Sequence, residues 1–143
     1  MVKKCTEPVK EDEILHVWLV DDHDGVRQSL AAMLGLEPRL NCARQFSSAN
    51  ELLLALQIQA PDVVLLDVQM PGISGVDAIA PIKKLAPLTS VLMLTSFADH
   101  ASKEQSLAAG ASDYLLKTDS LGEICAAIFA AKQGEGSIRT SNG

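Results

Sequence analysis

The segment "VVLLDVQMPG" (63–72) joins an uninterrupted apolar run to a carboxylate and then to a chain-breaking Pro-Gly pair. A continuous run of Val and Leu predicts a strand that is buried on both faces, as strands of parallel sheets are. Asp67 follows this run at once, in a position where ionisation is costly unless a partner compensates the charge. We therefore expect other polar groups to arrive at the same end of the sheet.

Apolar runs alternate with amphipathic stretches on both sides of this segment. Further strands are predicted at 16–20, 41–46, 90–95 and 113–116, and helices at 25–35, 48–59, 75–86, 101–110 and 120–134. Two helices begin with capping-box spacing, at Ser48–Glu51 and Ser120–Glu123, and Pro81 is expected to kink or shorten the helix that contains it. Repeated strand–helix units predict an α/β fold, a doubly wound parallel sheet of five strands with helices on both faces.

The totals limit the classes of function. The chain has 143 residues, of which 48% are hydrophobic, 3% aromatic and 21% charged, so one domain with an aliphatic core is expected. The net charge of −6 disfavours a broad nucleic-acid-binding face. No apolar run reaches the length of about 20 residues that spans a membrane, and the N-terminus lacks the apolar core of a signal peptide. Cys5, Cys42 and Cys125 have no metal-ligand spacing, so reduced thiols and a cytoplasmic location are expected.

Polar side chains follow four of the predicted strands. Asp21 and Asp22 come after the first strand, Asp67 after the third, Thr95 at the end of the fourth and Lys117 after the fifth. Sites in doubly wound sheets form beyond the carboxyl ends of the strands, so these groups are expected to share one cleft.

A divalent cation is the expected ligand of that cleft. If the first and third strands are neighbours, their backbones lie about 4.8 Å apart and three carboxylates crowd together. Like charges at that distance need raised pKa values or a counter-charge, and Lys117 supplies only one positive charge. The ligands are all oxygen, which suits Mg²⁺ or Mn²⁺. Read alone, Asp21 and Asp22 could instead cap the following helix.

The motifs "LVDDH", "LLDVQMPGISG", "VLMLTSF" and "GASDYLLK" occur in an order and spacing that resembles the receiver domain of bacterial two-component response regulators. They are most similar to the subgroup that usually carries a C-terminal helix-turn-helix domain. The resemblance covers residues 16–134, between a flexible N-terminal extension (1–15) and a C-terminal tail (135–143). It implies a flavodoxin-like strand order of 2-1-3-4-5. It also implies phosphorylation by a sensor histidine kinase in a Mg²⁺-dependent reaction.

The resemblance assigns roles to the groups at the strand ends. Asp67 matches the phosphoacceptor, which makes the chain a signalling domain with self-catalysed phosphotransfer and autodephosphorylation only. Asp21 and Asp22 match the acidic pair that binds the metal, with Asp22 favoured as the direct ligand. Gln69 matches the position whose backbone carbonyl also binds the metal.

The switch and the output are implied in the same way. Thr95 matches the hydroxyl and Lys117 the lysine that contact the phosphoryl group, and Tyr114 matches the aromatic switch residue. Partners would be the kinase and, on phosphorylation, a second copy of the chain. DNA would be reached only through an output domain that this chain does not contain. Thr118 stands where the family often has proline, which leaves the isomer of the Lys117–Thr118 bond open.

Two other functions on a related fold remain to be weighed. An aspartate-nucleophile phosphohydrolase would carry a DxD motif after its first strand, whereas this chain has "DDH" and places the candidate acceptor after the third strand. A flavodoxin-like cofactor binder would need a phosphate loop there, which the acids replace. A phosphorylation-independent interaction module on the same fold stays open, although the complete acidic set argues against it.

Overall fold

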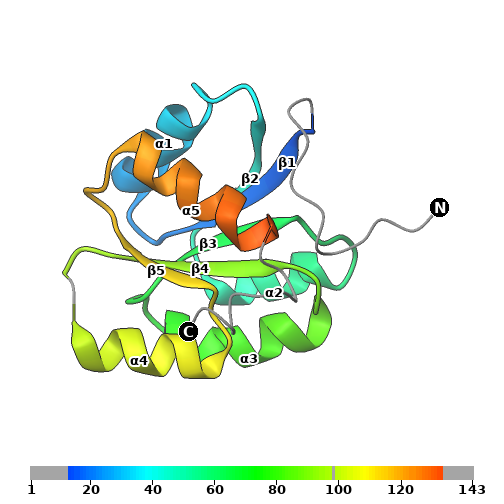
Figure 1. The fold of residues 1–143 in the computed structure, drawn as a ribbon. Coiled ribbons are helices and arrows are strands. Elements are labelled where there is room, and N and C mark those ends of the chain that lie inside the picture. The colour runs from blue at the N-terminus through cyan, green and yellow to red at the C-terminus, as the bar shows by residue number, and fades with distance from the viewer. Residues whose placement is uncertain (1–12, 98, 134–143) are drawn as a thin grey trace.

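A computed structural model describes residues 13–97 and 99–133, which form one α/β domain of three layers (Figure 1). The elements in chain order are β1 (Leu15–Val20), α1 (Asp24–Leu34), β2 (Leu40–Phe46), α2 (Ala49–Leu56), β3 (Val63–Asp67), α3 (Gly75–Leu85), β4 (Ser90–Thr95), α4 (His100–Ala109), β5 (Asp113–Leu116) and α5 (Leu121–Gln133). The five strands form a parallel sheet in the order β2-β1-β3-β4-β5. The predicted fold class and strand order are confirmed.

Helices α1 and α5 cover one face of the sheet, and α2, α3 and α4 cover the other (Figure 1). Successive side chains of each central strand point to opposite faces, so the sheet divides the core into two clusters. Val64 and Leu66 of β3 pack with α2 and α3, whereas Val63 and Leu65 pack with α1 and α5. This is why the quoted strand is apolar throughout.

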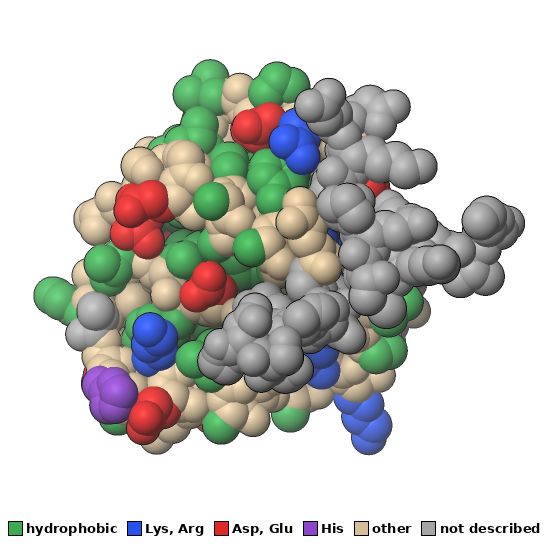
Figure 2. Space-filling model, viewed as in Figure 1, with side chains coloured by type: hydrophobic (Ala, Val, Ile, Leu, Met, Phe, Trp, Pro, Cys, Tyr) green, Lys and Arg blue, Asp and Glu red, His purple; other side chains and the backbone are tan. Residues whose placement is uncertain are grey.

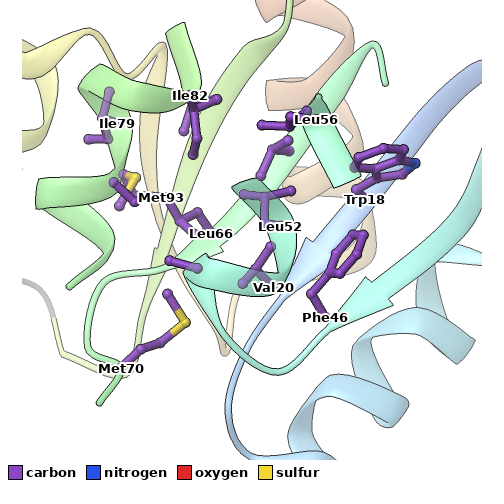
Figure 3. Packing of buried hydrophobic residues seen from close by; sticks show 14 of the residues in the cluster. Trp18, Val20, Phe46, Leu52, Leu56, Leu66, Met70, Ile79, Ile82 and Met93 are labelled. Carbon is purple, nitrogen blue, oxygen red and sulfur yellow. The ribbon is translucent and has the colours of Figure 1, made fainter. Parts of the chain in front are cut away.

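The cluster beneath α2 and α3 contains the largest buried side chains (Figure 3). Trp18 of β1 and Phe46 of β2 lie with their ring centroids 5.3 Å apart and their planes tilted by 56°. Leu52 of α2 and Ile79 of α3 are fully buried in the same cluster. Burial of such side chains contributes about 1.5–3 kcal/mol each, which fixes both helices on the sheet.

Strand β2 forms one edge of the sheet and carries a bulge. Its pairing with β1 runs from Val17 with Cys42 to Trp18 with Arg44, so Ala43 is left without a partner. The Arg44 guanidinium lies over both aromatic rings of this region, 5.2 Å from the Trp18 centroid and 4.9 Å from that of Phe46. The edge strand is therefore kinked and capped by a stacked cation.

The predicted element boundaries hold within one residue except in α2. That helix ends at Leu56, not at residue 59, because the amides of Gln57 and Ile58 bond to carbonyls three residues back, a tightened last turn that ends the helix. The exposed Ile58 lends no packing to a longer helix. Pro81 does not end α3, which continues to Leu85.

Both predicted capping boxes contribute to helix starts. Ser120 and Glu123 bond reciprocally, each main-chain amide to the other's side chain, at 2.9 and 3.1 Å. Ser48 accepts from the Glu51 amide, but the Glu51 carboxylate reaches back to Ser47 instead. No described peptide bond is cis, so the Lys117–Thr118 bond is trans.

The proposed extension and tail fall almost wholly on residues 1–12 and 134–143, which lie outside the described residues. Strand β1 begins at Leu15, which is buried and whose amide bonds to the Arg39 carbonyl. Among the described helices, none is long and apolar enough to cross a membrane. On the face shown in Figure 2, the Lys and Arg side chains of the described residues lie singly among apolar and acidic ones.

Candidate functional site

The carboxyl ends of the strands bring four predicted site residues to one edge. Asp21 follows β1 directly, and Asp67 is the last residue of β3, which pairs with β1 and with β4. Thr95 ends β4, and its carbonyl accepts a hydrogen bond of 2.8 Å from the Lys117 amide. The prediction that parallel topology gathers these groups is confirmed.

Lys117 bridges the two buried carboxylates. Its Nζ lies 2.7 Å from Asp21 Oδ2 and 3.3 Å from Asp67 Oδ2, and only 11% of its side chain is exposed. Burial alone would lower the pKa of Lys117, but the hydrogen bond to Asp21 and the charges of Asp67 and Asp21 outweigh burial and raise it. The ammonium therefore stays charged and supplies a fixed positive charge at the base of the site.

The three acids carry more negative charge than the Lys117 ammonium can compensate. One oxygen ligand atom from each of Asp21, Asp22 and Asp67, together with a His23 nitrogen, lies within 4.8 Å of the others. Asp21 Oδ2 and Asp67 Oδ2 share the single Lys117 ammonium, and Asp22 Oδ1 has only the His23 ring nitrogen close by, at 3.3 Å. One fixed positive charge does not balance three clustered carboxylates. Such a cluster of oxygen ligands fits a hard divalent cation such as Mg²⁺ or Mn²⁺.

The acidity of Asp67 reflects this crowding. Its pKa is raised from 3.8 to about 6, chiefly by burial and also by the neighbouring Asp21 charge, although Lys117 and the hydrogen bond from the Gln69 amide act in the opposite direction. That amide donates to Asp67 Oδ1 at 3.3 Å. A second counter-charge beside Asp67 would favour the ionised carboxylate, which is the nucleophilic form.

Neither acid of the β1–α1 turn caps the following helix. Helix α1 begins at Asp24 with His23 as its N-cap, and the Asp21 carboxylate accepts from the His23 amide at 2.9 Å, outside the helix. The capping interpretation of Asp21 and Asp22 is therefore wrong. The His23 imidazole lies 3.5 Å from Asp21 and 3.3 Å from Asp22 at the mouth of the site, with 68% of its side chain exposed.

Gly75 holds the Asp67 backbone and was not singled out in the sequence. It begins α3, and a Cβ at this position would clash with the Asp67 carbonyl oxygen and would lie 2.9 Å from the Val68 Cα. Its amide also donates to the Val68 carbonyl at 3.0 Å. The only available signal was a glycine that closes the quoted motif, at a helix start where Ser74 already provides the cap.

The two predicted switch residues, Thr95 and Tyr114, have contacts other than the acids. The Thr95 hydroxyl donates to the Phe97 carbonyl at 3.0 Å and accepts from the Phe97 amide at 3.2 Å, so it is engaged by its own loop. Tyr114 pairs with Met93 in the sheet and packs against the cluster beneath α2 and α3. The Tyr114 hydroxyl is buried and has no hydrogen-bond partner among the described residues.

Arg27 is a second group that the sequence reading missed. Its guanidinium donates to the Asp21 main-chain carbonyl at 2.8 Å and pairs with Asp24 at 2.9 Å, and its Nε donates to Gln45 Oε1 at 3.3 Å. In the sequence this arginine is simply a charged position of an amphipathic helix. No spacing rule distinguished it from a solvated residue.

A parallel sheet in this order, with acids and a lysine gathered at its carboxyl edge, defines the class of signal receiver domains. The receiver domain of the response regulator NarL from Mycobacterium tuberculosis has this fold with a TM-score of 0.80 and 29% identity, over 86% of this chain and 99% of that one. A response regulator from Burkholderia pseudomallei, solved with a phosphorylated aspartic acid, calcium ion and citrate, gives a TM-score of 0.72 and 28% identity, over 82% and 68% of the two chains.

The model of the response regulator receiver domain family matches residues 17–129, and the chain belongs to this family. Phosphorylation on an aspartate is the general function of the family, whose members generally bind Mg²⁺ at an acidic pocket and partner with sensor histidine kinases. The transcriptional regulatory protein LiaR of Bacillus subtilis is 38% identical over 123 residues, which are 85% of this chain. The chain spans 58% of that relative's length.

Proposed function

We propose that Asp67 is the phosphoacceptor of this receiver domain and takes its phosphoryl group from a sensor histidine kinase. The observation that carries this proposal is the placement of Asp67. Its carboxylate is buried at the strand edge, faces the Lys117 ammonium at 3.3 Å, and keeps one oxygen without a well-directed hydrogen bond. Asp21 shares these properties, with Lys117 closer, at 2.7 Å, and what favours Asp67 as the acceptor is its raised pKa and its place in the "LLDVQMPG" motif.

The chemistry is nucleophilic displacement at phosphorus. A carboxylate oxygen of Asp67 forms a bond to phosphorus, and the bond from phosphorus to the donor histidine nitrogen breaks, with its electron pair staying on the nitrogen. Lys117 stabilises the charge that develops on the transferring group, and its ion pair with Asp21 holds the ammonium in place. The domain supplies these groups itself, so the phosphotransfer is self-catalysed.

Asp21, Asp22, Asp67 and the backbone carbonyl of Gln69 would hold Mg²⁺ or Mn²⁺, with Asp22 as a direct ligand. The three carboxylates place one oxygen each within 4.8 Å of the others, and Asp22 is the most exposed of the three acids. When bound, the cation supplies positive charge for the phosphoryl oxygens and favours the ionised acceptor. The Burkholderia response regulator was solved with both a phosphorylated aspartic acid and a calcium ion, which supports a divalent cation in this proposal.

Intact-mass analysis tests the acceptor. Incubation with Mg²⁺ and a small acyl phosphate should add one phosphoryl group to the chain, and Asp67→Asn should abolish the addition. Asp77→Asn is the matched control, because Asp77 is an exposed acid in the first turn of α3. A phosphoryl group that persists in the Asp67→Asn protein would refute the assignment.

Calorimetric titration tests the metal ligands. Asp22→Ala should weaken Mg²⁺ binding and phosphorylation together, because both depend on the same carboxylate. Mg²⁺ affinity equal to that of the wild type would contradict the proposed ligand role of Asp22.

The proposed switch uses Thr95 and Tyr114. Phosphorylation would draw the Thr95 hydroxyl away from the Phe97 carbonyl and towards the phosphoryl oxygens. Tyr114 lines a groove with Asp99 and His100, and its hydroxyl has no hydrogen-bond partner within residues 13–97 and 99–133. A change of its rotamer would reshape the surface of α4, β5 and α5, where a partner or a second copy of the chain would bind.

Thr95→Ala separates acceptance of the phosphoryl group from the switch. The variant should still be phosphorylated at Asp67 but should lose phosphorylation-dependent dimerisation, measured by sedimentation. Amide exchange with a phosphoryl mimic should change over residues 101–133 in the wild type. A mimic that protects α1 and leaves that region unchanged would refute the Thr95–Tyr114 route.

The larger setting is transcription control. LiaR is named a transcriptional regulatory protein, and we propose that this chain serves a regulator of the same kind, with DNA contacted only through an output domain outside the sequence considered. The net charge of −6 supports a receiver that does not itself contact DNA. Phosphotransfer from purified kinases, scored by rate, would identify the cognate partner, and direct DNA binding by this chain alone would contradict the assignment.

A further inference from the structure

We propose that Arg27 is a positioning residue that sets the direction of the acidic pair Asp21–Asp22 towards the metal. This inference rests on the metal site proposed above and deepens it. Arg27 lies on α1, outside the motifs at the strand ends.

The guanidinium of Arg27 joins three elements beside the site. Nη1 donates to the main-chain carbonyl of Asp21 at 2.8 Å, Nη2 pairs with Asp24 of α1 at 2.9 Å, and Nε donates to Gln45 of β2 at 3.3 Å. Only 12% of the Arg27 side chain is exposed. A planar guanidinium with three contacts is held in one orientation. The flexible ammonium of a lysine could not make the same three contacts.

Arg27 acts on the acidic pair through the Asp21 main-chain carbonyl. It belongs to the peptide group that links Asp21 to Asp22, so its direction sets the plane from which both side chains project. The Asp21 amide is already fixed by the Phe46 carbonyl at 3.1 Å, and the Asp21 carboxylate by the His23 amide at 2.9 Å. The bond from Arg27 fixes the remaining polar group, so the whole turn is held before any cation arrives.

Charge and position predict opposite effects of removing Arg27. A positive charge beside the acids repels a cation, so if Arg27 acted through charge alone, its loss would tighten Mg²⁺ binding. If Arg27 acts by holding the turn, its loss weakens Mg²⁺ binding, because the carboxylates must be ordered when the cation binds. The sign of the change therefore separates the two roles.

Titration of the metal-free chain with Mg²⁺ alone, followed by calorimetry, tests the inference. Arg27→Met should bind Mg²⁺ about tenfold more weakly, the lower end of the range for partners that orient metal ligands. Arg27→Lys should fall between Arg27→Met and the wild type. Phosphorylation by a small acyl phosphate should need more Mg²⁺ in Arg27→Met but should reach the wild-type rate at saturating Mg²⁺, since Asp67 and Lys117 are unchanged.

Matched variants separate positioning from general loss of structure. Gln45→Ala removes one arm of the guanidinium contacts and leaves the Asp21 carbonyl bond, so it should weaken Mg²⁺ binding less than Arg27→Met does. Amide exchange without metal should show faster exchange at residues 21–23 in Arg27→Met, while the amides of β3 and β4 exchange as in the wild type. If Arg27→Met fails to fold, Arg27→Lys and Arg27→Gln carry the same comparison.

Two results would overturn the inference in distinguishable ways. If Asp22→Ala weakens Mg²⁺ binding but Arg27→Met binds as tightly as the wild type or more tightly, Arg27 does not position the acids. If Asp22→Ala itself keeps wild-type Mg²⁺ affinity, the proposed metal site is wrong, and the role of Arg27 falls with it.

Discussion

Replacement of Asp67 by asparagine should stabilise the metal-free protein at neutral pH. The Asp67 carboxyl is buried, with 5% of its side chain exposed, and its pKa is raised from 3.8 to about 6. Between pH 3.8 and about 6, Asp67 is therefore protonated in the folded protein but ionised in the unfolded chain. As the pH rises through this window the folded state must also release that proton, and the free energy of unfolding falls.

The size of the effect follows from the shift. A difference of about two pKa units corresponds to about 3 kcal/mol at neutral pH, which is an upper limit because the denatured chain also responds to the substitution. We expect Asp67→Asn to raise the free energy of unfolding by about 1–3 kcal/mol at pH 7.5 and by close to zero at pH 4. Lys117 keeps its contact with Asp21 in the variant, so no cation is left without a partner.

Urea unfolding in the presence of a chelator, followed by Trp18 fluorescence and circular dichroism, measures the difference. The comparison of Asp67→Asn with the wild type at each pH isolates one carboxyl, because all other groups titrate in both proteins. Glu104→Gln is a control, since 70% of the Glu104 side chain is exposed and its replacement should change stability by about 0.5 kcal/mol or less. A stability difference that is independent of pH, or a destabilised Asp67→Asn at pH 7.5, would refute the reasoning.

Mg²⁺ should narrow the difference in stability between Asp67→Asn and the wild type. A ligand at a hundredfold excess over its dissociation constant stabilises the folded state by about 2.7 kcal/mol. The wild type should gain more than Asp67→Asn, which lacks one of the three carboxylates. Equal gains in both proteins would mean that Asp67 is not part of the metal site.

Three further predictions concern residues around the site. Gly75→Ala should slow phosphorylation of Asp67 and destabilise the fold by more than about 1 kcal/mol, measured by acyl phosphate labelling and urea unfolding, because the new Cβ meets the Asp67 carbonyl; wild-type labelling would show that the backbone yields without cost. Ser106→Ala should leave stability unchanged or raise it by up to about 1 kcal/mol, since the buried Ser106 hydroxyl has no partner among the described residues; a clear loss in thermal unfolding would reveal a missed bond. Ser120→Ala should cost about 1 kcal/mol by removing the hydroxyl oxygen that accepts from the Glu123 amide, and amide exchange at the start of α5 should rise.

The site was largely predictable because topology alone brings strand ends together. Once five parallel strands were inferred, Asp21, Asp67 and Lys117 had to share an edge, whatever the details of packing. Side-chain direction is a different matter. The Thr95 hydroxyl bonds within its own loop, an arrangement set by the loop geometry and not by the strand pattern.

The groups that were missed act through the main chain. Arg27 was hidden within an amphipathic helix, where a charged position is expected to face water, and Gly75 is significant only because of what a Cβ would strike. Their main-chain contacts lie six and eight residues away, beyond the spacing of one helical turn, so no local periodicity reports them. The early end of α2 was also not predictable from local spacing. Ile58 fits the apolar pattern of the helix, but it is exposed because no neighbouring element covers it.

The two outer strands of the sheet also decide how the protein behaves in a crowded solution. An exposed strand rim is a template for the strand of another molecule, and a chain with so many aliphatic residues would aggregate if that template were straight and uncharged. Here the β2 rim is interrupted at Ala43 and carries the stacked Arg44 cation, while β5 at the opposite rim is only four residues long. A second molecule finds no long, regular ladder to extend. Straightening β2 by deletion of Ala43 should therefore favour pairing of β2 with a strand of another molecule.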